Sequence, residues 1–487
     1  MLFTEPTFLF LFLPVLLALY FATGRREHGE YGNWLLVAFS VIFYASGGGS
    51  FTVLILGSIA FNYVLAIAID RRRGTRRAKA LLAAAVATNL IVLGIFKYAN
   101  FFADNVNTLF LALGVRPIVI PRVFLPIGIS FFTFHAISYV VDVFRGDATA
   151  QKSPAHAALY LLLFPQLIAG PIIRYRDLAD QLARRIVSIE DFAYGVRRFI
   201  IGLAKKVLIA NVVAGPADQI FALPLAELSP GHAWLAIVCY TLQIYFDFSG
   251  YSDMAIGLGR MFGFRFPENF RWPYIAQSVQ EFWRRWHISL SSWFRDYLYK
   301  PLGGNRVSPG RTYVNLVTVF FLCGLWHGAS WNFVVWGLWH GLFLVLERLA
   351  HKVPVRRLPG AGPLAWPIWP HAYTLAVVMI GWVFFRAANL TYAAGFLGAL
   401  FGARPLQTTP YTVSWYLTSE LWLALIFGVV GSTPWVPTLA SSIQRRQRPW
   451  VFATTEALSV AALIALLVVS IMQVAAGTYN PFIYFQF

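Results

Sequence analysis

Long apolar runs recur along the chain and are separated by short polar connections. The clearest runs are Phe8–Phe21, Phe51–Ile69, Ala80–Ile95, Phe199–Val213, Ala233–Phe246, Leu316–Val335, Tyr373–Phe385, Leu421–Val430 and Ala457–Met472, and weaker ones are Trp34–Tyr44, Val123–Val141 and Ala157–Ala169. A helix of about 20 apolar residues crosses a bilayer, and shorter runs can also cross. The pattern therefore predicts an all-α polytopic membrane protein with about eleven transmembrane helices, organised as one domain over residues 1–487.

The composition agrees with a lipid environment. Hydrophobic residues make up 58% of the 487 residues and charged residues only 12%, whereas soluble proteins carry roughly 25% charged residues. We therefore do not expect the several water-soluble domains that a chain of this length would otherwise suggest.

The formal net charge of +18 needs a separate explanation, because a basic soluble protein would suggest nucleic-acid binding. The basic residues cluster in short connections, namely Arg71–Lys79, His351–Arg357 and Arg445–Arg448. Lysine and arginine in such connections indicate the cytoplasmic side of a membrane protein, which explains the charge better than nucleic acid does. If Arg71–Lys79 is cytoplasmic, the three preceding spans place the N-terminus on the opposite side.

The region from Phe262 to Arg311 is too polar to cross a bilayer and is rich in Trp, Arg and Pro. If residues 283–297 form one helix, its apolar face carries Trp283, Trp286, Leu290, Trp293 and Tyr297, at steps of three and four. The pattern predicts an amphipathic interfacial or re-entrant helix that ends at "PLGGNR", because Pro and Gly continue a helix poorly. His287 falls at the edge of the aromatic face.

The apolar run before this region ends in polar residues, "YFDFSGYSDMAIG" (Tyr245–Gly257). Ser249 and Asp253 are four residues apart and share one helical face. Carboxylates at such depth, Asp247 and Asp253, should face a protein interior or a watery cavity rather than lipid.

The stretch "GLWHGASWNF" (Gly324–Phe333) places His327 inside an apolar run. Neighbouring glycines allow close approach of a backbone or a thin ligand, and the tryptophans supply rigid apolar walls. A neutral imidazole in such a site can accept a proton from a hydroxyl. The alternative is a histidine that only hydrogen-bonds a neighbouring helix, and the residues alone leave both open.

His287 is a possible partner of His327, because it lies in similar tryptophan-rich surroundings. Taken alone, it is better explained as an interfacial histidine exposed to lipid headgroups. Cys323, one turn before His327, could relay an acyl group covalently, but it is better explained as a small buried hydrophobe.

Motifs of other enzyme classes are absent. The sequence contains no H-E-x-x-H, G-x-S-x-G or P-loop pattern, which argues against metalloprotease, serine-hydrolase and ATPase functions. We expect no bound metal. Polar residues inside spans would also suit a transporter, although we see no inverted halves.

The ordered set of motifs resembles the membrane-bound O-acyltransferase family, in particular its bacterial branch that acetylates alginate and other polymers. The motifs occupy Leu125–Gly146, Phe164–Tyr175, Phe246–Phe270, Glu281–Arg306, Gly324–Gly341 and Asn480–Phe487, and they are densest over residues 125–345.

The resemblance implies a ring of spanning and re-entrant helices around a central tunnel, and specific residue roles. The invariant catalytic histidine of the family matches His327, and an upstream polar catalytic position matches His287. Residues expected to bind the donor or line the tunnel are Trp283, Arg284, Arg285, Trp286, Ser249, Asp253, Trp326, Trp331 and Asn332. The two arginines would suit the phosphates of coenzyme A or of a carrier's phosphopantetheine.

The resemblance further implies transfer of an acyl group, most simply acetyl from acetyl-CoA, to hydroxyls of an exported polysaccharide. It implies location in the bacterial inner membrane and a periplasmic or membrane-anchored SGNH-type partner within a polysaccharide synthesis complex. D-alanyl transfer, peptidoglycan acetylation and transport without chemistry remain alternatives.

Overall fold

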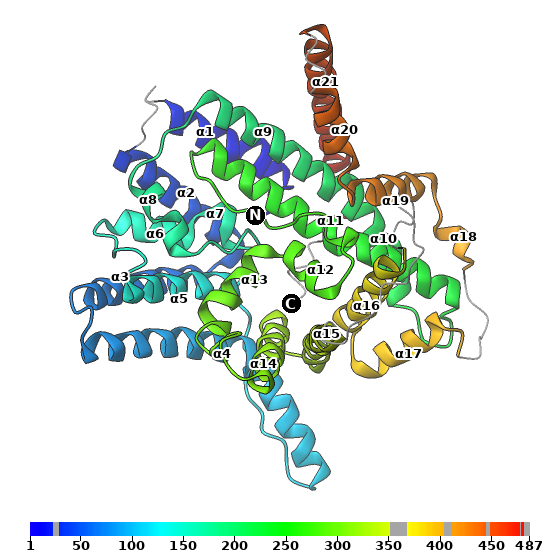
Figure 1. The fold of residues 1–487 in the computed structure, drawn as a ribbon, viewed down its shortest axis with the longest axis horizontal. Coiled ribbons are helices and arrows are strands. Elements are labelled where there is room, and N and C mark those ends of the chain that lie inside the picture. Colours follow the sequence, from blue (N-terminus) through cyan, green and yellow to red (C-terminus); the bar gives the residue numbers. More distant parts are fainter. Residues whose placement is uncertain (23–28, 351–367, 404–410, 445–448, 478, 482–487) are drawn as a thin grey trace. The chain divides into compact units, whose positions relative to one another are not determined.

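The computed structural model describes residues 1–22, 29–350, 368–403, 411–444, 449–477 and 479–481. The basic connections His351–Arg357 and Arg445–Arg448, and the end of the tail motif from residue 482, lie outside these ranges. The ordered elements of the described ranges are helices (Figure 1), as the apolar pattern predicts.

The chain divides into two compact units, one formed by Met1–Phe199 with Tyr251–Pro267, and the other by Ile200–Gly250 with Glu268–Phe487. Two helices, α9 (Ile189–Ala204) and α11 (Pro230–Met261), contribute residues to both. The expectation of a single domain stays a prediction.

In the first unit, three helices pack side by side, namely α3, α4 and α5 (Figure 1). Its remaining helices include α2, which packs on α6, and α6, which packs on α8. The elements are η1 (Phe8–Phe12), α1 (Leu13–Phe21), α2 (Gly29–Gly48), α3 (Phe51–Asp70), α4 (Arg76–Ala112), α5 (Ile129–Arg145), α6 (Pro154–Leu162), α7 (Phe164–Leu167) and α8 (Tyr175–Ala183).

In the second unit, the most extensive packing joins α14 to α15, and α15 in turn packs on α16 and α12. The elements are η2 (Lys205–Ala210), α10 (Asn211–Phe221), η3 (Pro273–Ile275), α12 (Val279–Arg285), α13 (Ile288–Phe294), η4 (Arg295–Tyr299), α14 (Pro309–His327), α15 (Trp331–Ala350), α16 (Ile368–Arg386), α17 (Leu390–Leu400), α18 (Val413–Tyr416), α19 (Ser419–Gly431), α20 (Trp435–Gln444) and α21 (Pro449–Ala475).

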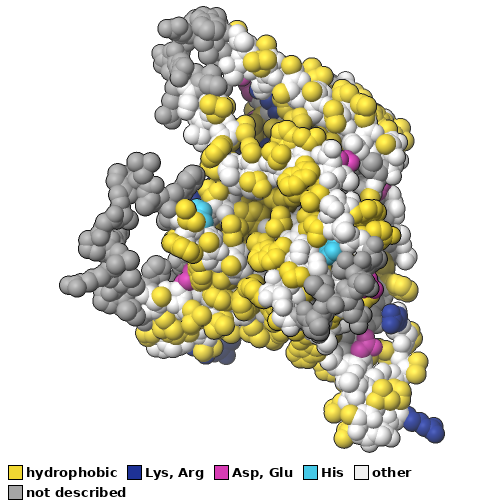
Figure 2. Space-filling view, turned by 90° about the vertical axis from the view of Figure 1, so that its right-hand side faces the viewer, with side chains coloured by type: hydrophobic (Ala, Val, Ile, Leu, Met, Phe, Trp, Pro, Cys, Tyr) yellow, Lys and Arg dark blue, Asp and Glu magenta, His cyan; other side chains and the backbone are white. Residues whose placement is uncertain are grey.

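Six helices of the described residues are long and apolar enough to cross a membrane: Phe51–Asp70, Arg76–Ala112, Ile189–Phe221, Trp331–Ala350, Ile368–Arg386 and Ala453–Ala475. A bent pair, Ser419–Gly431 with Trp435–Ser442, makes up to seven. Shorter apolar helices at Phe8–Phe21 and Leu390–Leu400 fall below this length. The expected eleven spans and the ring around a tunnel therefore stay predictions. On the face that Figure 2 shows, hydrophobic side chains are spread widely and charged side chains are sparse among the described residues, as suits contact with lipid.

One helix predicted from the sequence is wrong. Residues 283–297 do not form a continuous helix, because α12 ends at Arg285 and α13 begins at Ile288. Between them His287 adopts a left-handed conformation, with φ of 42° and ψ of 56°. The expected end of the segment is confirmed, since Gly303 and Gly304 both have positive φ.

Candidate functional site

The break between α12 and α13 is held by a single asparagine, Asn269. Its backbone oxygen accepts a hydrogen bond from the Ile288 N–H at 2.9 Å. Its side-chain Oδ1 accepts from the backbone N–H of Ser289 at 3.2 Å and from the Ser289 hydroxyl at 2.9 Å. The left-handed conformation costs a non-glycine residue of order 1–3 kcal/mol, so these bonds offset a real strain.

The same oxygen determines which nitrogen of His287 carries the proton. His287 Nδ1 lies 3.1 Å from Asn269 Oδ1. A backbone N–H can only donate, so the Asn269 atom that faces Ser289 N must be the oxygen. Nδ1 is therefore the protonated nitrogen, and Nε2 carries a lone pair.

The lone pair of His287 Nε2 points into the protein interior. The side chain is fully buried, and Nε2 has no hydrogen-bond partner among the described residues. α12 and α13 have seven residues each and are too short to span a bilayer. Complete burial lowers the pKa of the His287 imidazole to about 3, which keeps it neutral at pH 7. A buried acceptor of this kind is a position where a donor group of a ligand can bind.

His327 is the last residue of α14, and aromatic rings enclose it. Its ring centroid lies 4.9 Å from those of Trp326 and Trp336 and 5.1 Å from that of Phe385. The side chain is nearly buried, with 6% of its surface exposed.

One indole lies against both histidines. The ring centroids of His287 and Trp326 are 6.3 Å apart, and those of Trp326 and His327 are 4.9 Å apart. Segments that are 40 positions apart in sequence thus meet within the second unit. The two imidazoles that the sequence singled out share this aromatic neighbourhood.

Two glycines let α14 and α15 approach closely beside this cluster. A methyl group on Gly324 would collide with the backbone oxygen of Phe333, and one on Gly337 with that of Phe320. The close approach predicted from the glycines is therefore present, and another helix occupies it.

The expected tunnel residues of α12 have different environments. Trp283 packs edge-on against Phe320, with centroids 5.0 Å apart, and Trp286 lies 5.0 Å from Trp382. Arg284 is exposed. Arg285 forms an ion pair with Glu281 at 2.7 Å and donates to the backbone oxygen of Arg271 at 3.1 Å.

Polar residues of α11 are buried, as expected for carboxylates at membrane depth. Asp253 pairs with Arg198 at 2.6 Å, and Asp247 pairs with Lys206 at 2.8 Å. Ser249 is buried, and its hydroxyl has no hydrogen-bond partner in the described part of the chain.

Three other residues singled out near His327, namely Trp331, Asn332 and Cys323, are placed as follows. Trp331 is 54% exposed. Asn332 is buried and donates from Nδ2 to the backbone oxygen of Ala387 at 2.6 Å, which anchors α15. Cys323 is buried as a free thiol, in agreement with its explanation as a small hydrophobe.

Sequence reasoning missed Asn269, Trp336 and Phe385 as neighbours of the two histidines. Asn269 precedes His287 by 18 positions, beyond any helical spacing. Its only sequence signal is its place in the polar stretch "FPENF" directly after an apolar run. In the described residues, no group of three or more His, Cys, Asp or Glu side chains could hold a metal ion.

Comparison with known proteins adds an independent line of evidence. The model of the membrane-bound O-acyltransferase family matches residues 127–393. The chain is 43% identical to a probable alginate O-acetylase of Pseudomonas putida and 41% identical to that of Pseudomonas aeruginosa, each over 100% of both chains. It is 37% identical to a peptidoglycan O-acetyltransferase of Helicobacter pylori, over 82% of this chain and 80% of the relative.

Proposed function

Because this multi-pass membrane protein belongs to the membrane-bound O-acyltransferase family, we propose that it transfers acetyl groups from a cytoplasmic thioester, acetyl-CoA, to hydroxyls of an exported polysaccharide. Full-length similarity to alginate O-acetylases favours an alginate-like acceptor. The peptidoglycan relative, which matches a shorter part of the chain, keeps peptidoglycan as the second candidate acceptor.

In the proposed reaction, His327 is the general base and His287 is a positioning or thioester-contacting residue. The base takes the proton of the acceptor hydroxyl while its oxygen attacks the thioester carbonyl. The carbon–sulfur bond breaks, and the proton passes to the departing thiolate, so that an ester and a free thiol form. His287, with a pKa of about 3, is a weak base near pH 7, which suits an orienting hydrogen-bond acceptor better than a proton-abstracting group.

Two observations support this proposal. The rings of His287 and His327 both lie next to the indole of Trp326, and the lone pair of His287 Nε2 is buried. A buried acceptor that no described residue satisfies costs free energy, of order 1–3 kcal/mol. A hydroxyl or water bound at this nitrogen would recover that cost.

The proposed location is the bacterial inner membrane, with the Arg71–Lys79 connection in the cytoplasm and the N-terminus outside it. Transfer across the membrane hands the acetyl group to a polymer outside the cytoplasm. Only the small acyl group, and not the charged coenzyme A, needs to pass the membrane. We propose that an SGNH-type partner outside the cytoplasm then completes delivery of the acetyl group to the polymer.

The test uses the purified full chain in liposomes with acetyl-labelled acetyl-CoA and an oligosaccharide acceptor, with and without the partner. We expect His327→Ala to lower label transfer at least about 100-fold, the usual contribution of a general base. The matched control is Cys323→Ala, one turn away and equally buried, which should retain transfer. Normal transfer by His327→Ala contradicts the proposed role, and import of intact acetyl-CoA without ester formation favours a transporter.

A further inference from the structure

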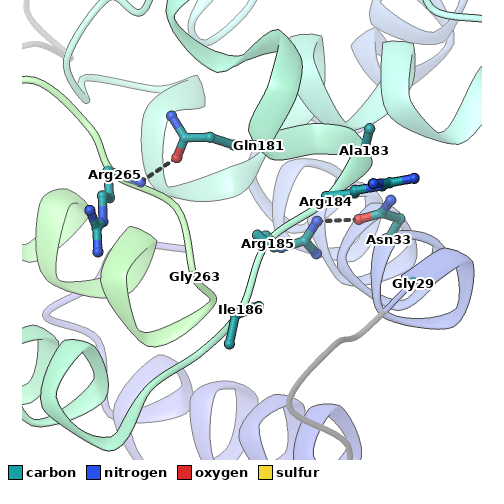
Figure 3. Close-up of a pocket in the computed structure, with 9 residues that line it drawn as sticks. All are labelled: Gly29, Asn33, Gln181, Ala183, Arg184, Arg185, Ile186, Gly263 and Arg265. Carbon is teal, nitrogen blue, oxygen red and sulfur yellow. Dashed lines mark hydrogen bonds between the residues drawn. The ribbon is translucent and has the colours of Figure 1, made fainter.

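A cavity of about 460 Å³ lies in the first unit (Figure 3), and neither His287 nor His327 is among the residues that line it. It is bordered by the start of α2, the end of α8, the connection after α8 and the turn after α11. Its polar lining consists of Asn33, Gln181, Arg184, Arg185 and Arg265. Every charged side chain among the lining residues is an arginine.

Arg185 is built into the cavity wall. Its Nε donates to the backbone oxygen of Phe262 at 3.0 Å, and its two terminal nitrogens donate to Asn33 Oδ1 at 2.6 Å and to the Tyr20 hydroxyl at 3.2 Å. Its guanidinium also lies 4.2 Å from the centroid of the Phe264 ring. These neutral partners hold the cation in place without neutralising it.

Arg184 and Arg265 complete the basic lining. In Figure 3, Arg184 and Arg185 lie beside Asn33, and Arg265 lies at the other side with Gln181. Arg184 is exposed. Gln181 Oε1 accepts from the backbone N–H of Arg265 at 2.7 Å, which fixes the chain at that arginine.

A carboxylate balances this charge only in part. Asp191 pairs with Arg265 at 3.2 Å, but it also pairs with Arg260 at 2.5 Å. Arg184 and Arg185 form no ion pair with a described residue. Guanidinium groups bind phosphate oxygens in a bidentate manner, and a partly enclosed site strengthens that attraction relative to open water.

Residues 150 and 151 link the end of α3 to α8, the helix whose end borders the cavity. The backbone N–H of Ala150 donates to Asp70 Oδ2 at 3.3 Å, and the next residue, Gln151, donates to the backbone oxygen of Ala179 in α8 at 3.3 Å. Ile186, which lines the cavity, is 58% exposed, and Ile189, three residues further along the chain, is 76% exposed. Exposed aliphatic side chains next to arginines are typical of the membrane–water boundary.

We infer that this cavity binds a phosphate-bearing ligand through Arg184, Arg185 and Arg265. The phosphate can come from two sources, the nucleotide part of an acyl donor or the headgroup of an anionic phospholipid. A volume of about 460 Å³ is within the range of small-molecule sites. The inference does not depend on the transfer reaction proposed above, because it concerns binding alone.

The test compares the purified full chain with the variant Arg184→Gln/Arg265→Gln, which leaves the structural Arg185 intact. Arg184→Gln alone is the second variant, since this exposed side chain is the least involved in folding. Arg77→Gln removes the same charge from an exposed position near the basic turn and is the matched control. Pyrophosphate affinity is measured by calorimetry at low and at 0.5 M salt.

We expect the double variant to bind pyrophosphate at least tenfold more weakly than wild type, Arg184→Gln to show an intermediate loss, and Arg77→Gln to bind as wild type does. Two further arms identify the source. If the double variant binds coenzyme A more weakly than wild type but binds pantetheine equally well, the site belongs to the acyl donor. If native mass spectrometry shows that the double variant retains less phosphatidylglycerol than wild type but the same amount of phosphatidylcholine, the site belongs to lipid.

Equal affinities of wild type and the double variant for pyrophosphate, coenzyme A and phosphatidylglycerol would overturn the inference, as would an equal loss in Arg77→Gln. The variant His327→Ala separates this site from the transfer reaction. It should bind pyrophosphate as wild type does, whether or not it transfers acetyl groups.

Discussion

The most informative single perturbation is at Asn269, because one oxygen there positions His287 and selects its tautomer. Replacing Asn269 by Leu removes the acceptor of three hydrogen bonds, from His287 Nδ1, Ser289 N and Ser289 Oγ. The Nδ1 proton then loses its 3.1 Å acceptor and keeps only a 3.5 Å contact with the Ser289 hydroxyl, so the imidazole can rotate or change tautomer. In either case the lone pair of Nε2 is no longer held toward the interior.

The size of the effect follows from the hydrogen bond that is lost. Leaving one buried donor unsatisfied costs about 1–3 kcal/mol, which corresponds to about 5- to 160-fold in rate if the whole cost appears in the transition state. We expect Asn269→Leu to lower kcat for acetyl transfer within this range, with a much smaller change in KM for acetyl-CoA. The protein should also unfold more easily, because two bonds to Ser289 are lost.

Two matched variants separate positioning from stability. Ser289→Ala removes the 2.9 Å hydroxyl bond to the same oxygen and a longer 3.5 Å contact of that hydroxyl with His287 Nδ1, but it leaves the 3.1 Å contact between His287 Nδ1 and Asn269. It should therefore lower stability and largely spare kcat. Asn269→Asp keeps an acceptor of the same shape. Its carboxylate, however, favours the imidazolium form and raises the pKa of His287, so activity should decline at a higher pH than in wild type as the solution is acidified.

The assay is label transfer from acetyl-CoA over a range of pH, with a thermal unfolding curve for each variant. An Asn269→Leu protein with wild-type kcat, or a Ser289→Ala protein with an equal loss of kcat, would show that the tautomer of His287 has no part in the reaction.

Three further outcomes are expected. Gly324→Val should lower the thermal unfolding temperature and acetyl transfer together, because α14 and α15 must separate to admit the side chain; an unchanged unfolding temperature contradicts this packing. Asp247→Leu removes the carboxylate that pairs with buried Lys206 and should cost about 3–5 kcal/mol of unfolding free energy. Asp247→Leu/Lys206→Met should recover most of that cost, and a double variant no more stable than the single one is the contrary result. Burial lowers the pKa of His287 to about 3 in the folded protein, whereas the unfolded chain takes up that proton near pH 6.5. The free energy of unfolding should therefore fall as the pH decreases from about 6.5 to about 3. Denaturant titrations of His287→Gln should show a smaller fall over the same range.

The helical, membrane-crossing character of the chain could be predicted because it depends on local pattern alone. An apolar run such as Phe51–Ile69 specifies both a helix and its solvent, and the structure has α3 at Phe51–Asp70. The burial of Asp247 and Asp253 followed from the same reasoning, since a charge at that depth must be paired. Their partners, Lys206 and Arg198, could not be predicted, because they lie 41 and 55 positions away on another helix.

The break at His287 could not be predicted for a related reason. Steps of three and four between large apolar residues continue from Trp283 through Trp286 to Leu290, so the local pattern favours one helix. What interrupts it is a contact distant in sequence: Asn269 binds the backbone N–H groups of Ile288 and Ser289. Local periodicity describes which residues are apolar, but not which backbone groups an asparagine elsewhere in the chain will satisfy.

The strain at His287 is best understood together with the burial of its ring. In a continuous helix, the backbone N–H of residue 288 would donate within the helix, and Asn269 would have no backbone donors to accept. In the observed break, Asn269 accepts from two backbone groups, a hydroxyl and the imidazole, and the ring meets Phe248 edge-on with centroids 4.6 Å apart. A side chain with only a packing role would not require a left-handed backbone, which costs of order 1–3 kcal/mol. The strain, the selected tautomer and the buried lone pair together therefore favour a binding role for His287 Nε2 over a purely structural one.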